Sequence, residues 1–130
     1  MRVLIDTHIL LWMFRAPERI SPAARKMLED PHVDIVISAV TPFEIATKVR
    51  IGKLPGVEPV LYSYQDHLAR WRADELAISS HHALVAGQLE WEHRDPFDRI
   101  LAAQSITEGL PLVTSDPAFG SMAGVRVIWE

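Results

Sequence analysis

Short apolar runs recur along the chain and are separated by longer stretches with helical spacing. Arg2–Ile5 and Asp34–Ser38 each contain consecutive Val, Leu or Ile residues, and Leu112–Thr114 and Val125–Trp129 repeat this pattern near the carboxyl end. A short continuous apolar run bounded by polar or small residues is typical of a strand buried on both faces. Leu76–Ile78 is a weaker candidate. We therefore expect a sheet of four or five strands.

Three pairs of a polar residue followed by Pro mark predicted helix starts. Ser21-Pro22, Thr41-Pro42 and Asp95-Pro96 each place a residue suited to the N-cap before a Pro at the first helical position. The second and third pairs predict helices over Phe43–Arg50 and Phe97–Thr107, and the first predicts a helix in the Ala- and Leu-containing stretch that follows it.

Two further helices are predicted from residue spacing. Pro59–Trp71 carries apolar residues three and four positions apart, as an amphipathic helix does, and His81–Trp91 is predicted as another. Gly52 and Gly109 fall where the helices before them should stop. Arg50–Pro59, with its Gly and Pro residues, is predicted to be an exposed loop.

Strands that alternate with helices indicate an α/β fold, in which a parallel sheet is covered on both faces and joined by right-handed crossovers. A length of 130 residues, 48% of them hydrophobic, predicts one domain over residues 1–130. The first residues do not form a signal peptide, and no apolar stretch approaches the roughly 20 residues of a membrane helix. With no Cys in the chain, we expect a cytoplasmic protein that makes no use of a membrane.

Four acidic residues stand where strands end or helices begin. Asp6 directly follows the first predicted strand, Glu44 opens the helix after the second, and Asp116 follows the strand that begins at Leu112. Asp98 lies in the first turn of the third predicted helix. In open parallel sheets, binding sites form beyond the carboxyl ends of the strands. We therefore expect these four carboxylates to meet at that edge.

Most of these acids also have an ordinary structural explanation. Glu44 fits a capping box that starts at Thr41, Asp98 suits the positive end of a helix dipole, and Asp116 before a Pro suits an N-cap. Asp95 is interpreted as an N-cap. The acid after the first strand has no such explanation unless it or the next residue caps the segment that follows.

Four carboxylates at one edge repel one another and raise each other's pKa unless a cation lies among them. Carboxylate-rich, all-oxygen sites suit Mg²⁺ or Mn²⁺, which can activate a bound water and orient a phosphodiester. Such a site would suit the hydrolysis of nucleic acid, although the net charge of −4 is unusual for a protein that approaches a phosphate backbone. If four of the 17 acids hold metal, the remaining 13 balance the 13 Lys and Arg residues.

The sequence resembles the PIN-domain nucleases, and within them the VapC-type toxins of toxin–antitoxin pairs. The resemblance covers nearly the whole chain and rests on five ordered pieces, Val3–His8, Ser38–Lys48, Gly52–Leu54, His93–Gln104 and Leu112–Asp116. It implies a three-layer α/β/α domain, endoribonuclease activity that depends on Mg²⁺ or Mn²⁺, a homodimer, and inhibition by a cognate antitoxin protein.

The same resemblance implies roles for individual residues. The catalytic acids would be Asp6, Glu44, Asp98 and Asp116. Of these, Asp6 and Asp98 would bind the metal directly, whereas the other two would act through waters or orient the nucleophile. Small hydroxyl positions beside the site are matched by Thr7 and Ser115.

Several other polar residues leave two interpretations open. Arg99 would contact a phosphate or form an ion pair on the helix surface, and Lys48 and Lys53 would steer RNA or remain solvated. Of the six His residues, only His8 is a candidate for the site, and the others are expected at the surface. Trp12–Phe14 is either core or part of a groove for a partner.

Other functions remain as alternatives. An aspartyl-phosphate phosphotransferase would use Asp6 as its nucleophile, but the second Asp that such sites commonly carry two residues later is His8 here. A PIN nuclease of RNA processing would need no antitoxin. A non-catalytic binding module, in which the acids are only caps, would bind no divalent ion tightly.

Overall fold

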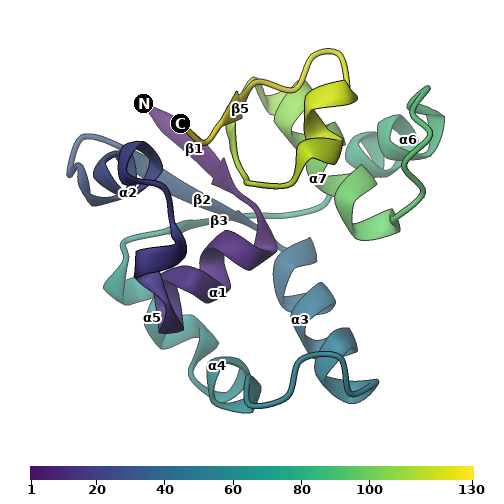
Figure 1. Ribbon diagram of the computed structural model, residues 1–130. Helices are drawn as coiled ribbons and strands as arrows, with labels where there is room; N and C mark the ends of the chain where they lie inside the picture. The colour runs from purple at the N-terminus through teal and green to yellow at the C-terminus, as the bar shows by residue number, and fades with distance from the viewer.

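The structure is a computed structural model that describes all of residues 1–130, and Figure 1 shows a sheet with helices on both sides. All strand pairs are parallel, and the strand order is β3-β2-β1-β4-β5. The strands are β1 (Arg2–Ile5), β2 (Asp34–Ser38), β3 (Asp74–Leu76), β4 (Leu112–Val113) and β5 (Val127–Ile128). The expected three-layer α/β/α architecture with a parallel sheet is confirmed.

Seven α-helices and two short 3₁₀ helices connect these strands. The α-helices are α1 (Thr7–Arg15), α2 (Pro22–Glu29), α3 (Val40–Arg50), α4 (Glu58–Tyr62), α5 (Tyr64–Arg70), α6 (Ser80–Gln88) and α7 (Pro96–Glu108). The 3₁₀ helices are η1 (Pro17–Arg19) and η2 (Pro117–Ser121). None of the helices is both long and apolar enough to cross a bilayer.

The two faces of the sheet bury different hydrophobic clusters. Val3 and Ile5 of β1 pack in a cluster with residues of α1, α2 and α5, whereas Leu4 packs with residues of α7 and η2. All three β1 side chains are fully buried, and each such aliphatic side chain stabilises the fold by about 1.5–3 kcal/mol. This double burial explains the continuous apolar run and makes β1 a rigid support for the residues that follow it.

β1 lies at the centre of the sheet, between β2 and β4. Leu4 is level with Val36 of β2 and with Leu112 of β4. Because the three strands are parallel and in this register, the chain leaves each of them at the same edge. α3 starts just beyond β2 and contacts both α1 and α7 (Figure 1). The carboxyl ends of the central strands therefore open onto a region bounded by three helices.

The prediction for the third strand was wrong by two residues. The expected strand over Leu76–Ile78 is instead Asp74–Leu76, which pairs with β2 alone at the edge of the sheet. Asp74 and Glu75 are both exposed. An edge strand tolerates charged residues of this kind, so it carries no apolar run for sequence inspection to find.

The helix predicted over Pro59–Trp71 is two helices, α4 and α5, that meet at Ser63. Ser63 has φ −113° and ψ 21°, outside the helical region, and its hydroxyl donates to the carbonyl of Pro59 at 2.8 Å. The apolar spacing continues across this break, which explains why it predicted one helix. The exposed loop expected over Arg50–Pro59 is shorter, because α3 runs to Arg50 and α4 begins at Glu58.

Helix ends agree with the sequence at some points and differ at others. Ser21 caps α2 and Gly109 ends α7 with φ +66°, as expected. α6 ends at Gln88, three residues before the predicted end at Trp91. α1, which the sequence did not predict, is separated from β1 only by its N-cap, Asp6, so no loop marks its start.

Candidate active site

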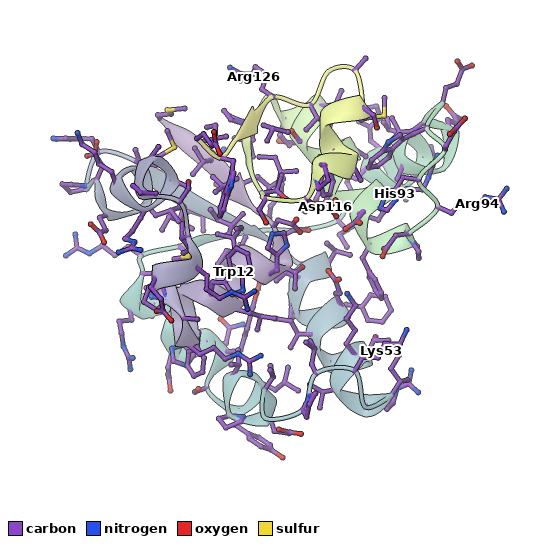
Figure 2. All side chains as sticks on the ribbon, in the orientation of Figure 1. Trp12, Lys53, His93, Arg94, Asp116 and Arg126 are labelled. Atoms are coloured by element: carbon purple, nitrogen blue, oxygen red, sulfur yellow. The ribbon has the colours of Figure 1, made fainter.

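A cavity of about 300 Å³ lies beyond the carboxyl ends of the central strands. Five carboxylates line it, with Lys48 as the single Lys or Arg among the lining residues. The carboxylates belong to Asp6, Glu44, Asp95, Asp98 and Asp116. The structure thus brings the four predicted acids to one cavity. Figure 2 shows Asp116 and His93, which also lines the cavity, near each other beside α7.

Asp6 is buried at the end of β1, where two hydrogen bonds and a contact with His8 hold its carboxylate. Its Oδ1 accepts the backbone N–H of Thr7 at 2.7 Å, which makes Asp6 the N-cap of α1. Its Oδ2 accepts the hydroxyl of Thr114 at 2.6 Å and lies 3.2 Å from Nδ1 of His8. Asp6 therefore both caps a helix and lies in the cavity, so capping and a role in the site are compatible here.

Glu44 is buried in α3 and does not belong to a capping box. α3 begins at Val40, before Thr41, and the buried Thr41 hydroxyl has no hydrogen-bond partner. Instead, Glu44 Oε1 accepts the hydroxyl of Thr7 at 2.6 Å, and Oε2 pairs with Lys48 one turn later. The capping-box interpretation of Glu44 was therefore wrong.

Lys48 is the positive group inside the acidic cavity. Burial opposes the charge on its ammonium group, but the hydrogen bond to Glu44 and the charges of Glu44, Asp95 and Asp98 raise the pKa of Lys48 above its ordinary value. Lys48 thus stays charged and remains bound to Glu44. Lys53, in contrast, lies exposed on the loop after α3 (Figure 2).

Asp98 and Asp95 lie three residues apart and have different partners. Asp95 Oδ1 accepts the backbone N–H groups of Phe97 and Asp98 at 2.9 and 3.2 Å, which confirms it as the N-cap of α7. Asp98 Oδ2 instead lies 2.6 Å from Nε2 of His93. Burial raises the pKa of Asp98 to about 6, and the charges of Asp95, Asp6 and Glu44 add to this against the hydrogen bond from His93.

Asp116 joins the site through the residues that follow β4. Its Oδ1 accepts the N–H of Ala118 at 2.9 Å and caps η2, as expected for an Asp before Pro. Its own N–H donates to the Thr114 hydroxyl at 3.0 Å, and this hydroxyl in turn donates to Asp6. Thr114 therefore links the two acids. The sequence did not single out Thr114, because a hydroxyl at the end of a strand has no distinguishing spacing.

Of the predicted small hydroxyl residues, Thr7 lines the cavity together with His8, whereas Ser115 does not. Thr7 bridges two acids, with its N–H on Asp6 and its hydroxyl on Glu44. Ser115 contacts His8 instead, with Oγ 2.8 Å from Nε2, and the other ring nitrogen of His8 faces Asp6.

Two expectations about basic residues were wrong. Arg99 neither faces the cavity nor forms an ion pair, because its guanidinium group donates to backbone carbonyls before α7, among them those of Leu89 and His93. His93, expected at the surface, lines the cavity and contacts Asp98. Its position just before a helix N-cap was the available signal. His67 and His82 are also buried rather than exposed.

The donor set fits a hard divalent cation. Besides Asp95, which caps α7, four carboxylates face one Lys, and the crowding of negative charge contributes to the raised pKa of Asp98, which a cation would relieve. No three His, Asp or Glu side chains are already arranged as a ligand set. An ion bound there would use a few carboxylates and keep several waters, as Mg²⁺ commonly does.

Comparison with known proteins defines the family. The sequence model of the PIN domain family matches residues 3–125, and the chain belongs to this family. It is 31% identical over 115 residues to Ribonuclease VapC22 of Mycobacterium tuberculosis, a match that covers 88% of this chain and 86% of that protein. The resemblance to VapC-type proteins expected from the sequence is confirmed.

Solved structures show the same fold. VapBC2 from Rickettsia felis, bound to a DNA fragment from its promoter, matches with a TM-score of 0.75 and 19% identity over 100% of both chains. DNA-bound VapBC from Salmonella typhimurium matches with a TM-score of 0.74 and 19% identity, over 98% of this chain and 97% of that one. At these identities, the likeness shows the fold alone.

Proposed function

We propose that this chain is the toxin of a toxin–antitoxin pair and an endoribonuclease that hydrolyses RNA phosphodiester bonds with Mg²⁺ or Mn²⁺. The observation that carries the proposal is the cavity in which Asp6, Glu44, Asp98 and Asp116 meet beyond the central strands of a PIN domain. The similarity to a ribonuclease of the VapC group supports the kind of reaction.

Asp6 and Asp98 are the residues that would hold the metal. Such an ion supplies a water of lowered pKa and stabilises negative charge on phosphate oxygens. Asp6 is fixed by the donors on both of its oxygens, whereas Asp98 has a protein partner only on Oδ2. The site would thereby combine the rigid carboxylate of Asp6, at the end of β1, with the less constrained carboxylate of Asp98, in the first turn of α7.

Glu44 and Asp116 have different parts in the reaction. Both oxygens of Glu44 are engaged by Thr7 and Lys48, so Glu44 would hold Lys48 where it can contact a substrate phosphate and would orient a water only through its remaining lone pairs. Asp116 uses Oδ1 for its cap. Its Oδ2 stays available to accept a proton from the attacking water, which is the task of a general base.

A cleavage assay tests this reaction. Purified chain, free of any partner, should cleave single-stranded or looped RNA with Mg²⁺ or Mn²⁺, and excess chelator should reduce cleavage to background because the acids alone supply no activated water. Readdition of the ion should restore it. Full activity in excess chelator would contradict the metal-dependent mechanism.

The toxin role rests on different support. The similar solved structures include a toxin–antitoxin complex from Klebsiella pneumoniae and VapBC-5 from Mycobacterium tuberculosis, a member of a family of toxin–antitoxin systems that matches with a TM-score of 0.65 and 17% identity. We expect expression of the chain alone to arrest growth, and co-expression of a small protein encoded beside it to relieve the arrest by covering the acidic cavity. Harmless expression of metal-active protein would contradict this role. The homodimer and the cytoplasmic location stay predictions.

A further inference from the structure

A second cavity adjoins the acidic one and shares a wall with it. It has a volume of about 450 Å³ and lies between the loop that joins α6 to α7 and the helix η2. Its lining residues are Glu90, Trp91, Glu92, His93, Ala118 and Ser121. His93 lines both cavities. A strand bound in the acidic cavity can therefore reach this second cavity past His93.

The Trp91 ring is held in place at this second cavity. Its centroid lies 5.6 Å from that of Phe119, which is fully buried, and 4.9 Å from that of the His93 ring. The indole N–H donates to the hydroxyl of Ser121 at 3.1 Å. The ring is nevertheless only half-buried. A large aromatic side chain that is already ordered loses little entropy when a ligand packs on it.

Arg99 fixes the loop that carries this ring. Its guanidinium group lies beneath the loop and donates to the carbonyls of Leu89, Trp91 and His93 at 2.6, 3.0 and 2.9 Å. Three charge-assisted hydrogen bonds from one side chain hold these alternate residues of the loop together. Arg99 is therefore a positioning residue for Trp91 and His93.

The charge of the second cavity selects which part of a nucleotide it can take. Glu90 and Glu92 line it, and none of its lining residues is Lys or Arg. The nearby Arg94 is exposed and extends away from the molecule (Figure 2). Phosphate is repelled by such a lining, whereas carboxylates accept hydrogen bonds from the amino groups of bases. The cavity thus suits a base rather than the RNA backbone.

We propose that the second cavity is a subsite for one unpaired RNA base next to the scissile phosphate, with Trp91 as its stacking surface. This inference rests on the proposed ribonuclease function and adds a determinant of substrate choice to it. A base can stack on Trp91 only when it is free of a duplex, because paired bases present no open ring face. The subsite therefore selects single-stranded or looped RNA.

The test combines a substituted protein with a substituted RNA. An oligonucleotide that the parent cleaves is remade with an abasic nucleotide at each position near the scissile bond in turn. The protein variants are Trp91→Leu, which keeps apolar packing on Phe119, and Trp91→Phe, which keeps an aromatic face. Trp71→Leu, at another half-buried Trp that packs against the opposite core cluster, is the matched control.

We expect Trp91→Leu to raise KM about tenfold, within the range of loss of one base–aromatic stack, while kcat changes by less than about threefold. Trp91→Phe should restore most of the loss, and Trp71→Leu should cleave like the parent. One abasic position should raise the parent's KM by a similar factor and leave the KM of Trp91→Leu unchanged. The proposal would be overturned if no abasic position raised the KM of the parent. It would also be overturned if the increases in KM caused by the abasic nucleotide and by Trp91→Leu multiplied when the two were combined.

Failure of the ribonuclease proposal would give a different result, namely no cleavage by the parent with either ion. In that case, binding of a fluorescent single-stranded oligonucleotide in excess chelator decides the subsite. Binding that Trp91→Leu weakens and Trp91→Phe restores supports it. Binding that is equal in the parent and both variants overturns it.

Discussion

The two ends of α7 each carry a carboxylate paired with a His, yet the pairs have different surroundings. At the amino end, Asp98 pairs with His93 at 2.6 Å, and at the carboxyl end, Glu108 pairs with His82 at 2.9 Å. Asp98 lies among further carboxylates at a cavity, which contributes to its raised pKa. A His–carboxylate pair is therefore not in itself a sign of chemistry, because the charge around it decides what it can do.

His82 shows what a structural pair looks like. Its Nδ1 accepts the N–H of Ser79, and this contact completes a capping box at the start of α6. Since Nδ1 accepts a hydrogen bond, Nε2 carries the proton and donates a hydrogen bond to Glu108. Both ring nitrogens of this buried side chain are thus satisfied within the fold, and no cavity lies beside them among those described above.

The largest expected difference between the two ends concerns activity. Asp98→Asn should reduce RNA cleavage at least tenfold, or about 1.4 kcal/mol of barrier, because it keeps the shape of the side chain and removes its charge. Asp6→Asn, Glu44→Gln and Asp116→Asn should do the same, measured as initial rates with Mn²⁺.

Asp95→Asn is the matched control for these four variants, since Asn caps a helix about as well as Asp and Asp95 lies three residues before Asp98. It should cleave within about twofold of the parent. Parental rates in all four variants as well would show that the charges of these acids take no part in cleavage.

A smaller effect is expected on the stability of the metal-free protein. Folding raises the pKa of Asp98 from 3.8 to about 6, so the folded state binds the proton more tightly than the unfolded state does. The contribution of Asp98 to stability is therefore fully present below about pH 4 and is lost as the pH rises through about 6. At pH 7.5 the negative charge of Asp98 therefore destabilises the folded, metal-free protein.

Asp98→Asn should accordingly stabilise the metal-free protein at pH 7.5 by about 1 kcal/mol, with part of the gain offset by the weaker hydrogen bond to His93. The gain should shrink towards pH 4. Urea unfolding in chelator at the two pH values measures it. A variant less stable than the parent at pH 7.5 would show that the charge of Asp98 is already compensated in the absence of metal.

The smallest effect is expected at the carboxyl end of α7. In Glu108→Gln, the amide oxygen can still accept the proton of His82, and the side chain of Glu108 is 39% exposed. Stability should change by no more than about 0.5 kcal/mol, and the cleavage rate should stay within about twofold of the parent. A tenfold loss of cleavage would mean that the chemistry extends along α7.

The parts of the fold that the sequence predicted are those in which one residue pattern has one physical cause. β1 and β2 are buried on both faces, so each appears as a continuous apolar run. The N-caps Ser21 and Asp95 each precede a Pro, and both side chains accept backbone N–H groups in the structure. In contrast, β3 has one neighbour and exposed acids, and its pattern resembles that of a loop.

The acids of the site were predictable because strand ends and helix starts are visible in the sequence. Their partners were not, since these contacts join distant parts of the chain. Thr114 reaches Asp6 across 108 positions, and Thr7 reaches Glu44 across 37. Arg99 looked like a phosphate ligand because the carbonyls that engage it, from Ala86 to His93, are brought to it by packing and not by any local pattern. Register and packing, rather than local pattern, place these groups.

A titration with Mn²⁺ tests most directly whether the acidic cavity is a metal centre. Free Mn²⁺ is measured by its electron paramagnetic resonance signal as parent, Asp98→Asn or Asp95→Asn protein is added without RNA. We predict that the parent and Asp95→Asn bind Mn²⁺ with similar affinity, and that Asp98→Asn binds it at least tenfold more weakly. Equal affinity in all three proteins, or no binding by the parent, would contradict a carboxylate metal site at the edge of this sheet.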